Sequence, residues 1–221
     1  MFSDFPHSLY YGILFIGALT GLLLYSRVSA PFKSVALLLL VTLVNELVAR
    51  YFKYQLRISN NPVYHIFTVI EYLLYAIIYS QFFKSKKWKQ ILFVTVLLLV
   101  FWEGINLAFF QQITKSNTNT LLLESLLLVI LSLNLFLKIR TDMEHGNLLS
   151  MGSLWFNAGV LLYYAVAILI WGFHSLKVYE LQNPPRIIYT LLLLFNTLLY
   201  SLFVVSICLD AFSQKKPKSA S

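Results

Sequence analysis

The chain consists of long apolar runs separated by short polar segments. Seven runs span residues 9–26, 34–54, 62–83, 90–110, 118–138, 150–173 and 186–210. A hydrocarbon core of ~30 Å is crossed by about 20 apolar residues in a helix. Strands of a membrane barrel alternate apolar and polar residues, whereas Val35–Val41 and Leu126–Leu131 are unbroken. The pattern predicts an all-α integral membrane protein, a single bundle of seven transmembrane helices over residues 1–212 and a basic, disordered cytoplasmic tail over 213–221.

Composition supports this class. The chain is 59% hydrophobic and 12% charged, with a mean hydropathy of +0.74, whereas soluble chains are about 45–50% apolar and about 25% charged. A single cysteine, Cys208, excludes an internal disulfide. The net charge of +8 comes from bases clustered between the apolar runs. Such clusters contact lipid headgroups, so we expect the lipid bilayer and no nucleic acid as a partner.

The distribution of the bases predicts the orientation. With the N-terminus outside, the inner segments hold 11 of the 17 Lys and Arg residues. These are Arg27, Lys33, Lys84, Lys86, Lys87, Lys89, Lys138, Arg140, Lys215, Lys216 and Lys218. Cytoplasmic loops carry an excess of bases. We therefore predict the N-terminus outside and the C-terminus inside.

Four of the nine acidic residues fall within predicted spans, namely Glu46, Glu71, Glu103 and Glu124 on the second to fifth helices. A carboxylate facing lipid costs about 2.5–3.5 kcal/mol on insertion scales. We therefore expect all four to point into the bundle and towards one another, in its outer half.

Other polar residues follow single helix faces. The repeats are Thr42, Glu46 and Arg50; Tyr64, Thr68, Glu71, Tyr75 and Tyr79, flanked by His65 and Tyr72; Ser153, Asn157, Tyr164 and Trp171; and Tyr189, Asn196 and Tyr200. Glu46 and Arg50, four residues apart, are expected to pair. The first helix has no such face and is expected to be more peripheral. The faces predict a polar cavity lined by the second to seventh helices and open to the outside.

This cavity defines the candidate ligand-binding residues: Glu46, Arg50, His65, Glu71, Glu103, Glu124, Asn157, Tyr164 and Asn196. The alternative is that they are packing contacts between helices, each of which stabilises a bundle by only about 0.6 kcal/mol. Four carboxyl groups from four helices at similar depth favour a binding function over packing alone.

Several chemistries lack their residues. The seventh predicted helix has no lysine for a retinal Schiff base, and no His-Glu-x-x-His or Gly-x-Ser-x-Gly motif occurs. We therefore expect no catalytic residues and no cofactor. His65 and Glu71 lie about 120° apart on one helix, so a metal ion would need ligands from other helices; the sequence leaves metal binding open.

Two features concern helix packing. Asn61-Pro62 and Asn183-Pro184 each precede a span, as an N-cap followed by proline, and the segments 66–68 and 188–190 match at an offset of 122. This could mark a three-plus-one-plus-three duplication, as in some transporters. A shared start signal is the simpler reading, because the other spans show no comparable match. Gly17 and Gly21 predict a close helix neighbour for the first span.

Three segments resemble a known family. Tyr64-His65-Ile66-Phe67-Thr68-Val69-Ile70-Glu71, Leu123-Glu124-Ser125-Leu126 and Trp155-Phe156-Asn157-Ala158-Gly159 are similar to an uncharacterised family of seven-helix inner-membrane proteins from Gram-negative bacteria of the Bacteroidota type. That family has no assigned activity. The resemblance implies a location, the bacterial inner (cytoplasmic) membrane, and no mechanism.

Three functions fit the sequence. The first is a receptor-like or sensory membrane protein that binds a small polar or cationic ligand from outside and acts through a cytoplasmic signalling partner, because the inner loops are too short for an output domain. The second is a proton- or cation-coupled transporter, which would need a second polar path by Asn157 and Asn196. The third is an enzyme acting on lipid, with Glu71 or Glu124 as general acid or base near His65.

Overall fold

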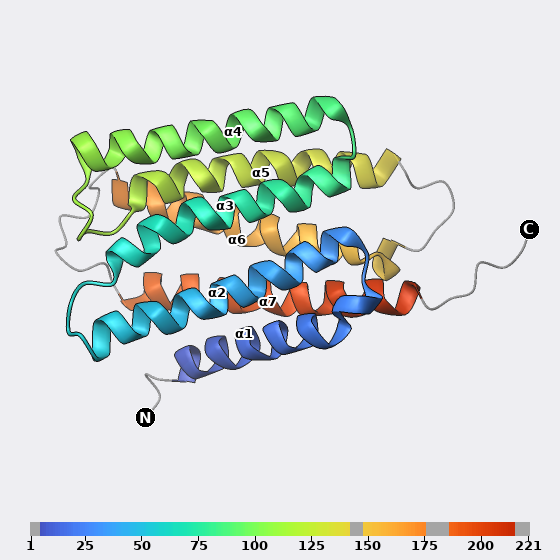
Figure 1. Ribbon diagram of the computed structural model, residues 1–221, viewed down its shortest axis with the longest axis horizontal. Coiled ribbons are helices and arrows are strands. Elements are labelled where there is room, and N and C mark those ends of the chain that lie inside the picture. Colours follow the sequence, from blue (N-terminus) through green and yellow to red (C-terminus); the bar gives the residue numbers. More distant parts are fainter. Residues whose placement is uncertain (1–4, 142–147, 176–185, 215–221) are drawn as a thin grey trace, which may run out of the picture.

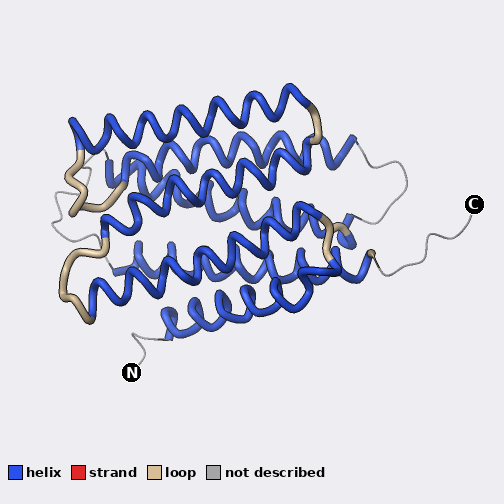
Figure 2. Tube along the Cα trace, viewed as in Figure 1, coloured by secondary structure: helices blue, strands red, loops and turns tan. Residues whose placement is uncertain are grey.

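The computed structural model describes residues 5–141, 148–175 and 186–214. Their seven long helices are α1 (Phe5–Leu24), α2 (Ala30–Tyr54), α3 (Asn61–Phe83), α4 (Lys86–Ile105), α5 (Thr118–Thr141), α6 (Gly152–Ser175) and α7 (Arg186–Ser213). Short helical turns cover Tyr25–Arg27, Asn106–Phe110 and Leu148–Ser150, and no strand occurs in the described ranges (Figure 2). All seven are long and apolar enough to cross a bilayer. The predicted all-α bundle of seven helices is confirmed.

The helix ends differ from the predicted ends for local reasons. α4 begins at Lys86 rather than at residue 90, because the Ser85 hydroxyl accepts a hydrogen bond from the Trp88 backbone N–H at 3.2 Å. α2 begins at Ala30, with proline in its first turn, where its missing N–H costs nothing. α7 continues to Ser213, so the predicted tail loses its first residue to the helix. The rest of that tail, residues 215–221, lies outside the described residues.

The N-cap expected at Asn61 is not found. Asn61 lies inside α3, and its side-chain amide donates a 2.6 Å hydrogen bond to the Thr114 carbonyl oxygen instead of accepting one from its own helix. The amide is drawn away because the chain before α5 passes beside the start of α3. The Asn183-Pro184 signal lies outside the described residues.

Five helices form a closed ring, in which α2 contacts α3, α3 contacts α5, α5 contacts α6, α6 contacts α7 and α7 contacts α2. α1 lies outside this ring and packs against α2 and α7. α4 also lies outside it and packs against α3 and α5, and Figure 1 shows it along one edge of the molecule. α1 begins at one end of the bundle and α7 ends at the other (Figure 1). We refer to these as the predicted outer and predicted inner ends.

The first helix is peripheral, as expected, because α1 packs mainly against α2 and α7 and these two helices contact each other. Its Tyr10 and Leu14 are buried. The glycine pair explains the close packing. A Cβ on Gly17 would meet Val204 of α7 at 3.3 Å and Leu39 of α2 at 3.4 Å, and one on Gly21 would lie 2.8 Å from the Ala36 Cβ. The predicted close neighbour of Gly17 and Gly21 is confirmed.

Aromatic side chains fill the half of the ring near the predicted inner end. The Phe156 ring stacks on Phe203 with centroids 5.0 Å apart and lies 5.8 Å from the ring of Tyr79. Tyr75 packs against the same phenylalanines from one turn further out. Because these rings come from α3, α6 and α7, they pack the interior of the bundle on this side.

Candidate functional site

The four carboxyl groups within the helices form two groups rather than one. Glu103 lies with His65 between α3, α4 and α5. Glu46, Glu71 and Glu124 face the interior of the ring, and we call these three the carboxylate cluster. The expectation that all four meet was wrong for Glu103, because its helix, α4, stands outside the ring.

Glu103 is held by hydrogen bonds at both oxygens. Its Oε1 lies 2.6 Å from Nδ1 of His65, and its Oε2 accepts from the Thr120 hydroxyl at 2.5 Å. The second imidazole nitrogen, Nε2, lies 3.0 Å from the Lys115 carbonyl oxygen. A carbonyl only accepts, so Nε2 carries a hydrogen. The other imidazole nitrogen, Nδ1, therefore faces the carboxyl oxygen of Glu103.

Side-chain amides surround this pair at the predicted outer end. The Asn106 amide donates to Gln111 at 3.0 Å and to Asn117 at 3.3 Å, and the Asn119 amide returns to Asn106 at 3.0 Å. These contacts hold the connection between α4 and α5 together. The Asn117 amide, which donates to the Thr68 hydroxyl at 3.5 Å, joins this connection to α3. Buried polar groups that satisfy one another in this way stabilise a bundle. The Glu103–His65 contact therefore has a structural role, which is to hold α4 against α3.

Glu46 accepts hydrogen bonds from three tyrosines. The hydroxyls of Tyr10, Tyr11 and Tyr64 donate to it at 3.1, 3.2 and 3.4 Å. The two from α1 were not among the predicted site residues, although Tyr10 and Leu14, four residues apart, begin the buried face that continues through Gly17 and Gly21.

Glu46 and Arg50 interact electrostatically, as their spacing predicts, but they form no hydrogen bond and no ion pair within 4.0 Å. Arg50 is exposed, and its guanidinium lies over the ring of Tyr11, 4.6 Å from the centroid, and over that of Tyr54 at 5.8 Å. Both contacts are cation–π geometry. The tyrosine hydroxyls already donate hydrogen bonds to the Glu46 carboxylate. Arg50 lies one turn nearer the helix end and stacks on the aromatic rings instead.

Glu71 and Glu124 have far fewer partners. Glu71 accepts one hydrogen bond, from the Tyr164 hydroxyl at 3.3 Å. Glu124 is 0% exposed, and neither of its oxygens has a hydrogen-bond partner. The buried Tyr72 and Tyr75 hydroxyls are also unpartnered. Glu71 interacts electrostatically with both Glu46 and Glu124, which joins the three carboxyl groups into one cluster.

The two asparagines lie apart from the cluster. Asn157 accepts from the Tyr79 hydroxyl at 3.0 Å and donates to the Ser132 carbonyl oxygen at 2.9 Å, so it fastens α3, α5 and α6 together near the predicted inner end. Asn196 is half-buried on α7, and no hydrogen bond joins it to another described residue. Of the predicted site residues, the structure thus brings together Glu46, Glu71, Glu124 and Tyr164.

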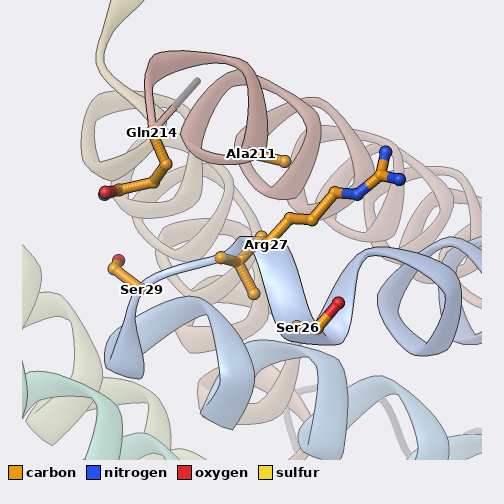
Figure 3. Close-up of a pocket in the computed structure, with 6 residues that line it drawn as sticks. Ser26, Arg27, Ser29, Ala211 and Gln214 are labelled. Carbon is orange, nitrogen blue, oxygen red and sulfur yellow. The ribbon is translucent and has the colours of Figure 1, made fainter. Parts of the chain in front are cut away.

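A pocket of about 330 Å³ lies at the predicted inner end. It is lined by Ser26, Arg27, Val28, Ser29, Ala211 and Gln214, none of which was a candidate (Figure 3). The backbone N–H of Ser29 donates to Asp210 at 2.7 Å and closes one side. In Figure 3 the Arg27 guanidinium extends away from the Gln214 amide, so these polar groups do not converge on one point.

The cluster does not offer a transition-metal site. Among the described residues, no three or more His, Cys, Asp or Glu side chains are placed to hold a metal ion together. His65, the sole imidazole among the candidates, is engaged by Glu103 and Lys115. The side chains of the cluster present carboxylate and phenol oxygen atoms. Such oxygen atoms bind a proton, a hard cation or an ammonium group.

No protein-family model, curated protein or solved structure matches the chain. The resemblance to the seven-helix inner-membrane family therefore stays a prediction.

Proposed function

We propose that the chain is a receptor-like or sensory protein of the bacterial inner membrane, with its N-terminus outside and its C-terminus inside. A small polar or cationic ligand enters from the outer side and binds at the carboxylate cluster. The base count and the resemblance support the location and orientation. A cytoplasmic signalling partner would detect the resulting helix movement, because the connections at 25–29 and 84–85 are too short to carry an output domain.

One observation carries the proposal: Glu124 is fully buried with both oxygens unpartnered. Burying a polar group without a hydrogen bond costs folding free energy, and burying a carboxylate without a counter-charge costs more. Glu103, which bonds Thr120 one helix turn before Glu124, shows what a purely structural carboxyl group looks like in this bundle, since both its oxygens are bonded. Glu124 has the opposite arrangement, which is expected of a group that meets its partner only when a ligand is bound.

The aromatic rings beside the cluster suit a cationic ligand. Tyr164 packs edge-on against Tyr75 and Tyr163, with ring centroids 5.6 and 4.8 Å apart, and Tyr10 lies 5.8 Å from Tyr200. Tyrosine faces attract ammonium groups, and neighbouring carboxylates add charge attraction. An organic ammonium ion is thus the ligand class that the residues favour.

The test is ligand-induced stabilisation of the purified full-length chain. Unfolding is followed by tryptophan fluorescence in detergent with choline, ethylammonium, guanidinium and the neutral carbon isostere of choline. The proposal expects at least one cation to raise the unfolding midpoint and the isostere to have no effect. Glu46→Gln and Glu71→Gln should remove the shift, and Asp210→Asn, which changes an acid at the other end, should retain it. Stabilisation that survives in both cluster variants counts against the proposal.

A second candidate, a cation-coupled transporter, is favoured by the contacts between the helices. If α1, α2 and α3 correspond to α5, α6 and α7, each contact within the first group has its counterpart in the second, and the contact of α7 with α1 mirrors that of α3 with α5. α4, the linking helix, stands outside both groups, as a three-plus-one-plus-three duplication requires. The receptor is preferred because Asn157, expected on an inner path, is bonded within packed helices. Flux of a stabilising cation into proteoliposomes would decide for the transporter.

The lipid-modifying enzyme gains no support. It required His65 beside Glu71 or Glu124, and His65 instead bonds Glu103 and the Lys115 carbonyl.

A further inference from the structure

The Glu71–Glu124 pair has a chemistry more specific than the cluster as a whole. We infer that it binds one monovalent cation, an alkali metal ion or a proton, in the interior of the ring. The inference rests on the proposed function in treating this pair as the inner part of the same ligand site. It is tested with the cation alone.

The surroundings of Glu124 consist of oxygen groups. Among the described residues, the titratable groups that interact with it electrostatically are Glu71, Tyr72 and Tyr75 of α3 and Tyr163 and Tyr164 of α6. α4 faces Tyr72 with the hydroxyl-bearing Thr95. Glu71 in turn interacts with Glu46 of α2 and Tyr200 of α7. Arg50 interacts with Glu46, but no Lys, Arg or His is among the described groups that interact with Glu71 or Glu124. The Glu71–Glu124 pair therefore supplies negative charge without a positive partner.

The unpartnered hydroxyl of Tyr75 is a second observation that points to a ligand. Tyr75 is 0% exposed, and its hydroxyl interacts with Tyr164 as well as with Glu71 and Glu124 but has no hydrogen bond of 3.5 Å or less. A phenol oxygen can coordinate a hard cation through its lone pairs or donate to a carboxylate. Buried polar atoms in native proteins are nearly always satisfied. A cation between the two carboxyl groups would give the Tyr75 oxygen and both Glu124 oxygens their missing partner.

The charge of the Glu71–Glu124 pair favours a monovalent cation. Two carboxylates that repel one another are relieved by a single positive charge, delivered by an alkali ion or by a shared proton. A divalent ion is usually held by more than two acidic ligands or by waters. Glu124 and Tyr75 are sealed from solvent, and no three acidic side chains of the described residues are placed to hold an ion together. An organic ammonium ion suits the half-buried Glu46 side of the cluster, where access is greater.

The experiment measures unfolding of the full chain against the cation alone. Sodium, potassium and lithium chloride are titrated against N-methylglucamine chloride at constant ionic strength, and the series is repeated across pH without alkali ions. An alkali ion at 100 times its dissociation constant should raise the unfolding midpoint by about 5 °C or more. If the proton is the ligand, the alkali series is flat, and the midpoint rises as the pH falls.

The rise of the unfolding midpoint with alkali ions or with protons should be absent in Glu124→Gln and in Glu71→Gln. Asp210→Asn should retain it. A wild-type response that persists in both cluster variants, or a wild type that responds to neither alkali ions nor protons, overturns the inference.

Infrared difference spectra of the wild type provide a readout that needs no variant to fold. Sodium binding or protonation should change a carboxyl stretching band, and an unchanged carboxyl region also overturns the inference. A cation response without any response to choline, ethylammonium or guanidinium would leave this inference intact and refute only the proposed receptor ligand.

Discussion

The Nδ1 atom of His65 lies 2.6 Å from Oε1 of Glu103, and this contact joins α3 to α4 outside the helix ring. The Thr120 hydroxyl occupies the other carboxyl oxygen, so both oxygens of Glu103 are satisfied. Glu124 lies one helix turn after Thr120 on α5, with neither oxygen bonded. The two buried acids are therefore opposite in their hydrogen bonding.

Replacing these two acids should therefore have opposite consequences for stability. Glu103→Gln replaces the charge-assisted bond with a neutral one, or leaves His65 with a mismatched donor, and should destabilise the fold by about 1–3 kcal/mol. In a buffer without alkali ions, Glu124→Gln removes a buried carboxyl group without removing a hydrogen bond, and should be neutral or stabilising. Unfolding midpoints of the two variants in one detergent check this. A larger loss for Glu124→Gln would mean that Glu124 has a structural partner.

The tyrosines of α1 provide a second prediction, which concerns the energetic coupling between Tyr10 and Glu46. Tyr10 donates to Glu46 from the buried face of α1. Tyr10→Phe keeps the ring and deletes the donor, so its cost should be about 0.6 kcal/mol, the average for such contacts in membrane bundles. Combined with Glu46→Leu, which removes the acceptor, the two costs should not add, since the second change acts on a bond already lost. A double-mutant cycle of unfolding free energies measures the coupling, and full additivity would show that the bond contributes nothing.

The positions of the helices could be predicted from the sequence because the bilayer imposes one length and one composition on each span. The interior face of α3 was also predictable, since Thr68, Tyr75 and Tyr79 repeat at helical spacing and all are buried. Periodicity shows which face of a helix is polar. It does not show which helix lies opposite.

The contacts that the sequence did not predict are contacts between helices, which periodicity along one helix does not show. Glu103 was grouped with the other acids by depth, although α4 lies outside the ring. Tyr10 and Tyr11 were missed because one helix turn near a membrane surface commonly carries tyrosine for interfacial reasons. Arg50 was paired with Glu46 by spacing, while its guanidinium stacks on Tyr11. In each case a contact between distant segments decided the outcome.

The packing of α1 gives a third prediction with a matched control. A Cβ at Gly21 would lie 2.8 Å from the Ala36 Cβ and 3.1 Å from its Cα, so Gly21→Ala forces α1 and α2 apart. We expect a loss of about 1–3 kcal/mol. Gly12 is on the same helix, and a Cβ added there would meet nothing within 4 Å, so Gly12→Ala should be neutral or stabilising by up to about 1 kcal/mol. Equal effects of the two substitutions on thermal unfolding would refute the close approach of α1 and α2.

The proposed orientation yields a prediction that a labelling experiment can test. Ser116 lies in the exposed connection between α4 and α5, and Lys87 is exposed in the first turn of α4, at the opposite end of the bundle. In a Cys208→Ser background, Ser116→Cys should react with a membrane-impermeant maleimide on spheroplasts, whereas Lys87→Cys should react only after permeabilisation. The physical reason is the excess of Lys and Arg at the Lys87 end, which holds that end in the cytoplasm. The reverse pattern would invert the bundle. The carboxylate cluster would then lie nearer the cytoplasmic surface, and the ligand would have to be a cytoplasmic one.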